Sequence, residues 1–170
     1  FKQKTAYEIV DCDWSSDVCS SDLGSTNRVR EVANYFNAEM VICDKHRKRA
    51  NEIASMVVIG DVTGKDIVIV DDICDTGGTL VKAAALLKEK GAKTVRALIT
   101  HPVLSGKAYE NIETSVLEEL VVCDTIPLKQ SSKKIQVLTV ADLFAIAIRN
   151  AYENKSITSL FVHSQLKARS

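Results

Sequence analysis

The chain has 170 residues, of which 46% are hydrophobic and 26% charged, with 22 basic and 22 acidic side chains. This balance is typical of one globular domain and excludes a disordered, fibrous or strongly basic nucleic-acid-binding protein. No apolar run approaches the roughly 18 residues of a membrane helix, and no basic stretch followed by an apolar segment predicts a secretory signal, so we expect a cytoplasmic protein.

Residues 1–23 differ from the rest of the chain, because they are rich in Ser and Asp and show no helical or strand periodicity. They resemble the translation of a sequencing-library adaptor, with residues 2–9 and 13–23 matching its two arms and 10–12 spanning the sample index. We predict that this segment is not native; a disordered tail is the alternative. Removing its two basic and five acidic residues leaves 20 and 17, a charge of about +3 that suits small anionic substrates.

The first expected elements are a helix, three strands and a loop. Apolar residues recur at helical spacing over 28–36, and residues 40–43 read as a buried strand. Residues 44–55, DKHRKRANEIAS, have no sustained apolar period and predict a mobile loop. The β-branched runs 56–59 and 66–70 are separated by GDVTGK, which suits strands joined by a tight turn.

The second half alternates helices and strands. In chain order we expect a helix at 79–90 with Leu80, Ala83, Ala84 and Leu87 facing inward and Gly91 as its stop, a strand at 94–100, a helix at 107–112, strands at 120–123 and 135–138, and a helix at 140–151 capped by Thr139 with Asp142 in its first turn. This alternation predicts an α/β fold with a parallel sheet flanked by helices and right-handed crossovers.

The strongest functional pattern is IVIVDDICDTGGT at residues 67–79, a buried strand that ends in two carboxylates and turns through two glycines into a helix. Ligands of open α/β sheets bind beyond the carboxyl ends of the strands, and a glycine loop opening a helix offers N–H groups to phosphate. Asp71 and Asp72 can accept hydrogen bonds from sugar hydroxyls or interact with hydrated magnesium. The pattern predicts a pentose phosphate site.

A structural turn is the alternative for this run, with the aspartates capping the helix and the glycines permitting the bend. The strand before it and the helix after it favour the phosphate site, because that context is what such a motif requires. Cys74, which lies within this run, is one of five cysteines without zinc spacing.

The run DDICDTGGT resembles the phosphoribosyl pyrophosphate-binding signature of type I phosphoribosyltransferase folds. Four further segments resemble ribose-phosphate pyrophosphokinases in order and spacing: DKHR at 44–47, THPVLSG at 100–106, LEELVVCDTIPL at 117–128 and SITSLF at 156–161. The resemblance covers nearly all of residues 24–161. It identifies residues 24–163 as the C-terminal domain of such an enzyme, followed by a tail at 164–170.

The resemblance implies magnesium-dependent transfer of the β,γ-pyrophosphoryl group of ATP to the C1 hydroxyl of ribose 5-phosphate. That chemistry needs no thiol, so Cys74 is expected to pack rather than to act as a nucleophile. It implies that ribose 5-phosphate is bound by Asp71, Asp72, Asp75, Thr76, Gly77, Gly78 and Thr79. Lys45 would be the catalytic lysine and Arg47 its ATP-contacting partner, because cations neutralise charge on the transferring oxygens; a solvated charged loop is the alternative. Ser156 and Thr158 match positions that bind a regulatory phosphate or ADP in relatives, with simple capping as the alternative.

The family's enzymes have a second, N-terminal domain that supplies adenine-binding residues and a metal-binding histidine, and they assemble as dimers and hexamers. Asp22 falls near the place of a second metal ligand by accident, so no metal ligand is assigned in this chain. We therefore expect little synthetase activity from this polypeptide. The alternatives are a nucleobase phosphoribosyltransferase, which would lack THPVLSG and the Lys45/Arg47 loop, and a silent regulatory subunit, which would carry a disrupted phosphate loop.

Overall fold

The computed structural model describes residues 18–21, 29–30, 32–34, 37–49 and 52–160. The chain divides into two compact units, one spanning Ser15–Leu138 and the other containing Thr139–Ser170. The first unit contains the sheet and the glycine loop. The predicted native domain at 24–163 stays a prediction, and its predicted tail at 164–170 lies outside the described residues.

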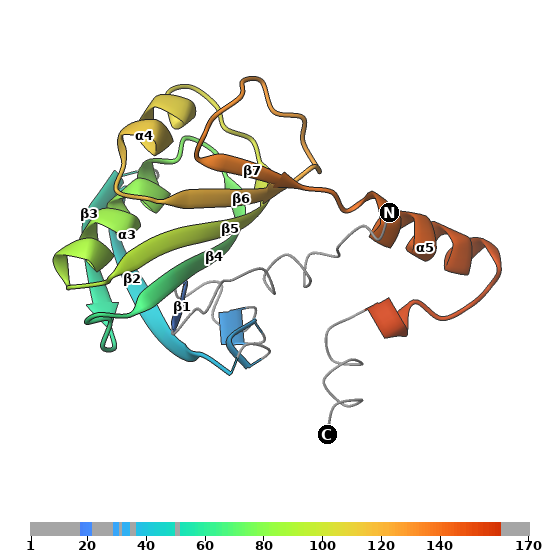
Figure 1. Ribbon diagram of the computed structural model, residues 1–170, viewed down its shortest axis with the longest axis horizontal. Helices are drawn as coiled ribbons and strands as arrows, with labels where there is room; N and C mark the ends of the chain where they lie inside the picture. Colours follow the sequence, from blue (N-terminus) through green and yellow to red (C-terminus); the bar gives the residue numbers. More distant parts are fainter. Residues whose placement is uncertain (1–17, 22–28, 31, 35–36, 50–51, 161–170) are drawn as a thin grey trace. The chain divides into compact units, whose positions relative to one another are not determined.

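The described residues form one seven-stranded sheet with the order β3-β2-β1-β4-β5-β6-β7 (Figure 1). Its strands are β1 Val18–Ser21, β2 Glu39–Arg49, β3 Glu52–Ile59, β4 Asp66–Cys74, β5 Thr94–Pro102, β6 Glu119–Cys123 and β7 Ile135–Leu138. All neighbouring strands run parallel except β2 and β3, which are antiparallel. The expected parallel α/β sheet is confirmed.

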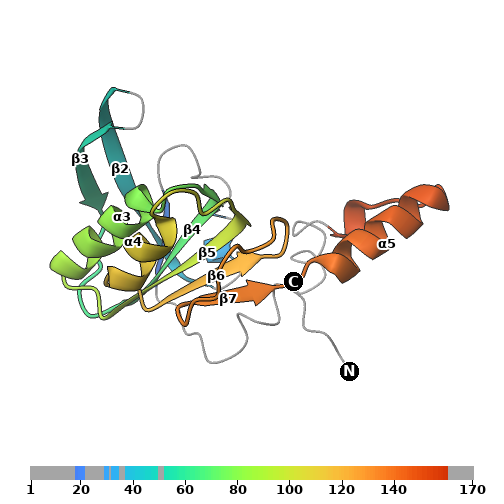
Figure 2. The same ribbon diagram turned by 90° about the horizontal axis from the view of Figure 1, so that it is seen from above.

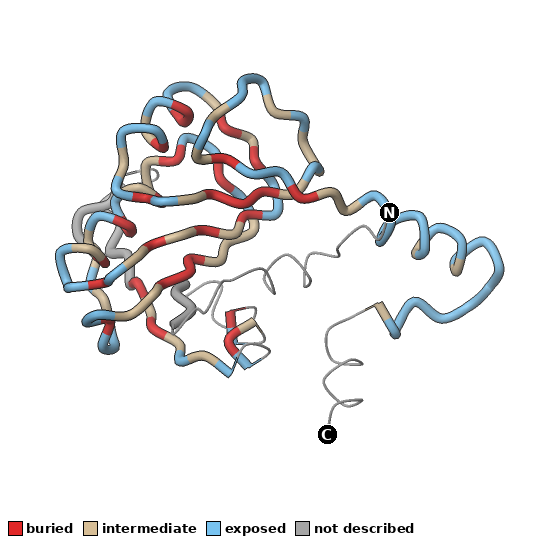
Figure 3. Tube along the Cα trace, in the orientation of Figure 1, coloured by how far each residue is buried: buried red, intermediate tan, exposed pale blue. Residues whose placement is uncertain are grey.

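Helices α3 (Gly78–Glu89) and α4 (Ala108–Thr114) cover one face of this sheet (Figure 1). The side chains of α3 expected to face inward are all buried there: Leu80, Ala83, Ala84 and Leu87. They pack in one core with alternate residues of the central strands, including Ile67, Val95 and Leu120. Figure 3 shows buried residues along β4, β5 and β6. Burial of apolar area at this interface is the main stabilising contribution to the fold.

The opposite face of the sheet is covered in part by the helical residues 29–30 and 32–34, within the predicted helix 28–36. Val29 and Ala33 are buried and pack against Met40 of β2 and Val70 of β4. These strand residues alternate with Val41 and Ile69, which belong to the core under α3. β2 and β4 therefore carry apolar side chains on both faces, as expected for strands within a parallel sheet.

Helix α3 ends as the sequence predicts, at a glycine. Gly91 has φ 96°, which a residue without a Cβ adopts at little cost. The N–H of Gly91 donates to Lys88 O, and the N–H of Ala92 donates to Leu87 O, both at 3.0 Å. This pair of bonds satisfies the last carbonyls of α3 and turns the chain directly into β5.

The prediction of a mobile loop at residues 44–55 is wrong. Residues 44–49 continue β2 and residues 52–55 begin β3, and together they form an antiparallel hairpin. Lys45 pairs with Met56 and Arg47 with Ile53, with register shifts on both sides of Arg47. The hairpin extends away from the other strands (Figure 2). Backbone hydrogen bonds form this ladder and do not require apolar side chains. The charged sequence of the hairpin therefore lacks the apolar alternation from which a strand is predicted.

The strands after this hairpin differ from the prediction in extent and in pairing. β3 and β4 are both present, but β2 and β1 lie between them, so the turn at Val62–Lys65 does not join neighbouring strands. β4 also continues past Val70 to Cys74, because its backbone goes on pairing with β5 as far as Pro102. Asp71 and Asp72 therefore lie within the strand rather than beyond it.

The second unit contains helix α5 (Ala141–Tyr152) and the short 3-10 helix η2 (Thr158–Leu160). The expected helix 140–151 is confirmed, with Asp142 in its first turn. Thr139 Oγ1 accepts a hydrogen bond from the Ala141 N–H at 3.3 Å, although the residue in the N-cap position is Val140. Within the described part of the chain, no helix combines the length and hydropathy needed to cross a membrane.

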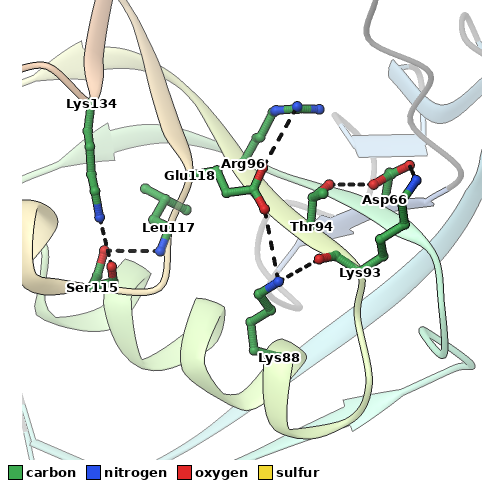
Figure 4. Close-up of polar contacts among 9 residues, drawn as sticks. All are labelled: Asp66, Lys88, Lys93, Thr94, Arg96, Ser115, Leu117, Glu118 and Lys134. Carbon is green, nitrogen blue, oxygen red and sulfur yellow. Dashed lines mark hydrogen bonds and ion pairs between the residues drawn. The ribbon is translucent and has the colours of Figure 1, made fainter.

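A polar network joins the amino ends of the central strands (Figure 4). Asp66 accepts hydrogen bonds from Thr94 Oγ1 at 2.6 Å and from Lys93 Nζ at 3.0 Å. Glu118 forms an ion pair with Arg96 at 3.8 Å. Hydrogen bonding from the Thr94 hydroxyl, followed by the Lys93 ammonium, lowers the pKa of Asp66 despite its partial burial. The network therefore stabilises the edge of the sheet that lies opposite the glycine loop.

We expect Asp66→Asn to lower the free energy of unfolding by about 1 kcal/mol at neutral pH, because the amide loses the charge that strengthens the bonds to Lys93 and Thr94. The pKa of Asp66 is lower in the folded than in the unfolded chain. This stabilisation is therefore present above the unfolded value and lost as the pH falls through the folded value. Urea unfolding at neutral pH and at about pH 3 measures the difference.

Glu89→Gln is the matched control, because it removes an exposed carboxylate at the last residue of α3. Its free energy of unfolding should change by less than about 0.5 kcal/mol. An Asp66→Asn penalty of the same size at both pH values would contradict the role assigned to the charge.

Candidate functional site

The candidate site lies where the parallel strands end. β4, β5 and β6 run in the same direction and end at Cys74, Pro102 and Cys123, so their carboxyl ends share one edge of the sheet. Loops at this edge of an open α/β sheet are the usual place for a ligand. The glycine loop predicted to bind phosphate leaves β4 here and enters α3.

Gly77 is the residue at which this loop turns into the helix. It is the N-cap of α3 and has φ 71°, in the left-handed region that favours glycine. A Cβ at this position would lie 3.6 Å from Ala108 O, so α4 packs directly over the turn. The N–H groups of Gly78, Thr79 and Leu80 precede Val81, the first donor of the helix's own ladder, which bonds to Gly77 O at 3.0 Å. These three groups can receive an anion.

Asp71 and Asp72 are half-buried residues near the end of β4. Asp71 Oδ1 accepts a hydrogen bond from the Asp72 N–H at 2.9 Å. Both carboxylates lie near the carboxyl edge of the sheet, where they can accept hydrogen bonds from a ligand.

The loop at 100–106, which follows β5, contacts the glycine loop closely. The Leu104 N–H donates to Cys74 O at 3.1 Å, and the Ser105 N–H donates to Asp75 O at 3.0 Å. The Ser105 hydroxyl also donates to the Asp75 carboxylate. From α4, Asn111 Nδ2 donates to Thr76 O at 3.0 Å. Ser105 and Asn111 were not predicted as site residues, and only the position of Ser105 in THPVLSG hinted at a role.

A second contact ties the end of β5 to the end of β6. Thr125 Oγ1 donates to Thr100 O at 2.8 Å, and His101 Nδ1 lies 3.0 Å from the same hydroxyl. The segments THPVLSG and CDTIPL, which lie far apart in the sequence, therefore meet at the edge that carries the glycine loop.

Cys74, the last residue of β4 before the loop, is only 4% exposed. Burial raises the pKa of its thiol to about 11; the hydrogen bond from the Gly77 N–H opposes this rise, and the charges of Asp71 and Asp75 add to it. The thiol is therefore protonated at neutral pH, which agrees with the expectation that Cys74 packs rather than reacts.

Lys45 and Arg47 lie on β2 in the part of the hairpin beyond Ile42, the last residue of β2 that pairs with β1. β2 runs parallel to β1 and β4, so this part of the hairpin extends past the same edge of the sheet as the glycine loop. The side chains of residues 44–55 lie outside the described part of the structure. The catalytic roles expected for Lys45 and Arg47 stay predictions.

Ser156 and Thr158 lie in the second unit and are exposed. Ser156 Oγ accepts from the Thr158 N–H at 3.1 Å and donates to Thr158 Oγ1 at 2.9 Å. These bonds cap the start of η2, so the local geometry fits the capping alternative. The regulatory phosphate site stays a prediction.

No group of three or more His, Cys, Asp or Glu side chains suited to a metal ion occurs among the described residues. Magnesium in nucleotide enzymes is commonly held by one or two carboxylates together with substrate phosphates and water. Asp71 and Asp72 fit that limited role, and the described residues offer no complete magnesium cage.

Comparison with known proteins places this site in a family. A family model described as the phosphoribosyl synthetase-associated domain matches residues 18–162, which include the glycine loop and both segments that meet at its edge. The chain belongs to this family. The match begins at Val18, and β1 itself lies within residues 1–23, the segment predicted to be non-native. That prediction is not tested by the match, because a backbone ladder accepts many sequences.

Curated relatives of this phosphoribosyl synthetase-associated domain are ribose-phosphate pyrophosphokinases. The one from Campylobacter jejuni is 55% identical over 143 residues, which are 84% of this chain and 46% of the relative. The one from Wolinella succinogenes is 54% identical over 145 residues, covering 85% and 47%. The chain therefore spans about half the length of the curated relatives it matches.

Solved structures similar to this domain confirm its fold. The phosphoribosylpyrophosphate synthetase from Mycobacterium smegmatis superposes with a TM-score of 0.78 at 31% identity, over 87% of this chain and 49% of that one. A purine phosphoribosyltransferase from Pyrococcus horikoshii gives 0.50 at 21% identity, over 76% and 80%. The second likeness concerns the fold alone, which is the expected phosphoribosyltransferase-like α/β sheet.

We expect iodoacetamide to alkylate Cys74 at pH 8 on the order of 100-fold more slowly in the folded domain than in urea, because burial keeps the thiol protonated. Quenched labelling followed by peptide mass spectrometry measures both rates. Cys123, which is half-buried, provides the internal reference. Labelling of Cys74 as fast as that of Cys123 in the folded chain would contradict the closed packing of the loop.

Proposed function

We propose that this chain is the part of a ribose-phosphate pyrophosphokinase that binds ribose 5-phosphate. The whole enzyme would transfer the β,γ-pyrophosphoryl group of ATP to the C1 hydroxyl of ribose 5-phosphate, giving phosphoribosyl pyrophosphate and AMP. The observation that carries this proposal is the glycine loop between β4 and α3, in a chain 55% identical to a protein of that name. We place the protein in the cytoplasm, and the whole enzyme in a homo-oligomer, as a hexamer.

The phosphate of ribose 5-phosphate would lie at the start of α3. The N–H groups of Gly78 and Thr79 and the positive end of the helix dipole favour a dianion there. Thr76 and Thr79 would add hydroxyl donors, as the sequence predicts. Asp71 and Asp72 would then accept hydrogen bonds from ribose hydroxyls and fix the orientation of the sugar. This arrangement would bind both the phosphate and the sugar of a pentose phosphate.

The pyrophosphoryl group needs positive charge beside it, since such transfer is catalysed by positioning and charge neutralisation. Lys45 and Arg47 would supply that charge from the hairpin β2–β3, which extends beyond the carboxyl edge of the sheet. Magnesium, when bound, would neutralise part of the charge on the ATP phosphates. The remainder of the ATP site would come from the half of the enzyme that this chain does not span.

The competing hypothesis is that the chain is part of a nucleobase phosphoribosyltransferase, an enzyme class that would share its fold. No feature of the described site favours it. The segment THPVLSG, which such an enzyme would lack, is present and provides two of the backbone donors to the glycine loop. A silent regulatory subunit is equally disfavoured, since the phosphate signature at residues 75–79 is intact.

We expect the 170-residue chain to bind ribose 5-phosphate saturably, and Thr79→Val to weaken that binding about tenfold, because one hydroxyl donor is lost without a change in size. Isothermal titration calorimetry measures both affinities. Free ribose, which lacks the phosphate, should bind far more weakly. Thr114→Val, at the far end of α4 from the loop, is the matched control and should bind as the parent does.

Failure of a folded chain to bind ribose 5-phosphate would overturn the proposal for this site. Equal binding by the parent and Thr79→Val would remove Thr79 from the phosphate site.

We expect the chain to form AMP from ATP, Mg²⁺ and ribose 5-phosphate at no more than background rate, because it spans about half of its relatives' length. A coupled assay for AMP measures this rate. Substantial turnover by the purified chain would show that the residues present suffice for the ATP site.

A further inference from the structure

We propose that Ser105 and Asn111 are positioning residues that hold the glycine loop in its anion-binding shape without touching the ligand. The identity of the ligand rests on the proposed function, whereas the effect on the loop does not. Both residues lie outside the run 67–79 that defines the phosphate signature, one in the loop after β5 and the other on α4.

Three consecutive carbonyl groups at and after the end of β4 accept hydrogen bonds from the 100–106 loop and α4. Cys74 O accepts from the Leu104 N–H, Asp75 O from the Ser105 N–H, and Thr76 O from Asn111 Nδ2, at 3.1, 3.0 and 3.0 Å. The first two donors belong to the backbone, so they depend on the path of residues 104–105 rather than on side-chain identity. The third is a side-chain donor that a substitution can remove.

Fixing these carbonyls also fixes the N–H groups of the peptides that contain them, because each peptide unit is planar and its C=O and N–H point in opposite directions. The peptide that joins Thr76 to Gly77 directs its N–H towards the thiol of Cys74. After the turn at Gly77, the N–H groups of Gly78 and Thr79 are presented at the start of α3. Asn111 therefore acts at the last peptide before the anion-binding groups.

The carboxylate of Asp75 presents a separate difficulty, since a negative charge within a phosphate loop repels the ligand. Ser105 donates its hydroxyl to Asp75 Oδ1. This bond gives the carboxylate a fixed partner on the side of the 100–106 loop. Asp75 is then a residue that shapes the loop, and the hydroxyl of Ser105 determines where its charge lies.

Packing does not account for Ser105 or Asn111. Their neighbours Leu104, Ala108 and Ile112 belong to the buried core, whereas Ser105 and Asn111 are half-exposed polar residues outside it. Removing either polar group should therefore disturb the loop more than it disturbs the stability of the fold.

The test uses Ser105→Ala and Asn111→Leu, neither of which changes the net charge, in the 170-residue chain. Affinity for ribose 5-phosphate is measured by calorimetry, and the exchange rate of the Gly77 amide proton by NMR. We expect each variant to weaken binding about tenfold and to speed exchange at Gly77 about tenfold, with a melting temperature close to that of the parent. Ser105→Thr, which keeps a hydroxyl, should restore both values.

Thr114→Ala is the control on α4, because among the described residues the Thr114 hydroxyl bonds within that helix, to Glu110 O and Asn111 O. It should leave affinity and exchange unchanged. The proposal is overturned if the Gly77 amide proton exchanges as slowly in Ser105→Ala and Asn111→Leu as it does in the parent, or if Thr114→Ala reproduces the effects of these variants. Failure of the parent to bind ribose 5-phosphate would instead count against the proposed function, and exchange at Gly77 would still decide the positioning role.

Discussion

Three backbone carbonyls at the end of β4 impose the constraint on which the site depends. Cys74 is the last residue of β4 to pair with β5, and the carbonyls of Asp75 and Thr76 lie beyond that ladder, so their hydrogen bonds must come from other segments. The 100–106 loop and α4 supply the donors. The glycine loop then turns at Gly77, whose φ of 71° favours glycine, with α4 in van der Waals contact beside the turn. The same turn exposes the N–H groups that can bind an anion.

The parallel sheet separates stability from ligand binding. At the amino ends of the strands, Asp66 and Glu118 organise charges that stabilise the fold. At the carboxyl ends, backbone groups and short polar side chains from β4, β5 and β6 meet through Thr125 and Ser105. Because all central strands run the same way, every loop that follows one of them reaches the same edge. The hairpin β2–β3 extends past that edge as well.

Most elements could be predicted from the sequence because their residues bury a regular apolar pattern. The four inward residues of α3 and the bounds of β7 agree with the structure to the residue. The sequence of residues 44–55 predicts a loop because the hairpin is formed by backbone hydrogen bonds in a charged stretch. Such a stretch shows no alternation of apolar and polar residues. The end of β4 was placed too early for a related reason: pairing with β5 continues through Asp71 and Asp72, although polar residues usually signal the end of a buried strand.

The sequence by itself determined the α/β class, the glycine loop and the residues of the phosphate signature, because each depends on residues close together along the chain. It could not determine the strand order, the separation of β3 from β4 or the roles of Ser105 and Asn111. Those depend on contacts between segments that are not adjacent along the chain, such as the pairing of Val18 with Ile67, made largely by backbone groups that every residue carries. Only the tertiary structure decides which donor bonds to each carbonyl, because backbone carbonyls are the same at every residue and the sequence does not distinguish them.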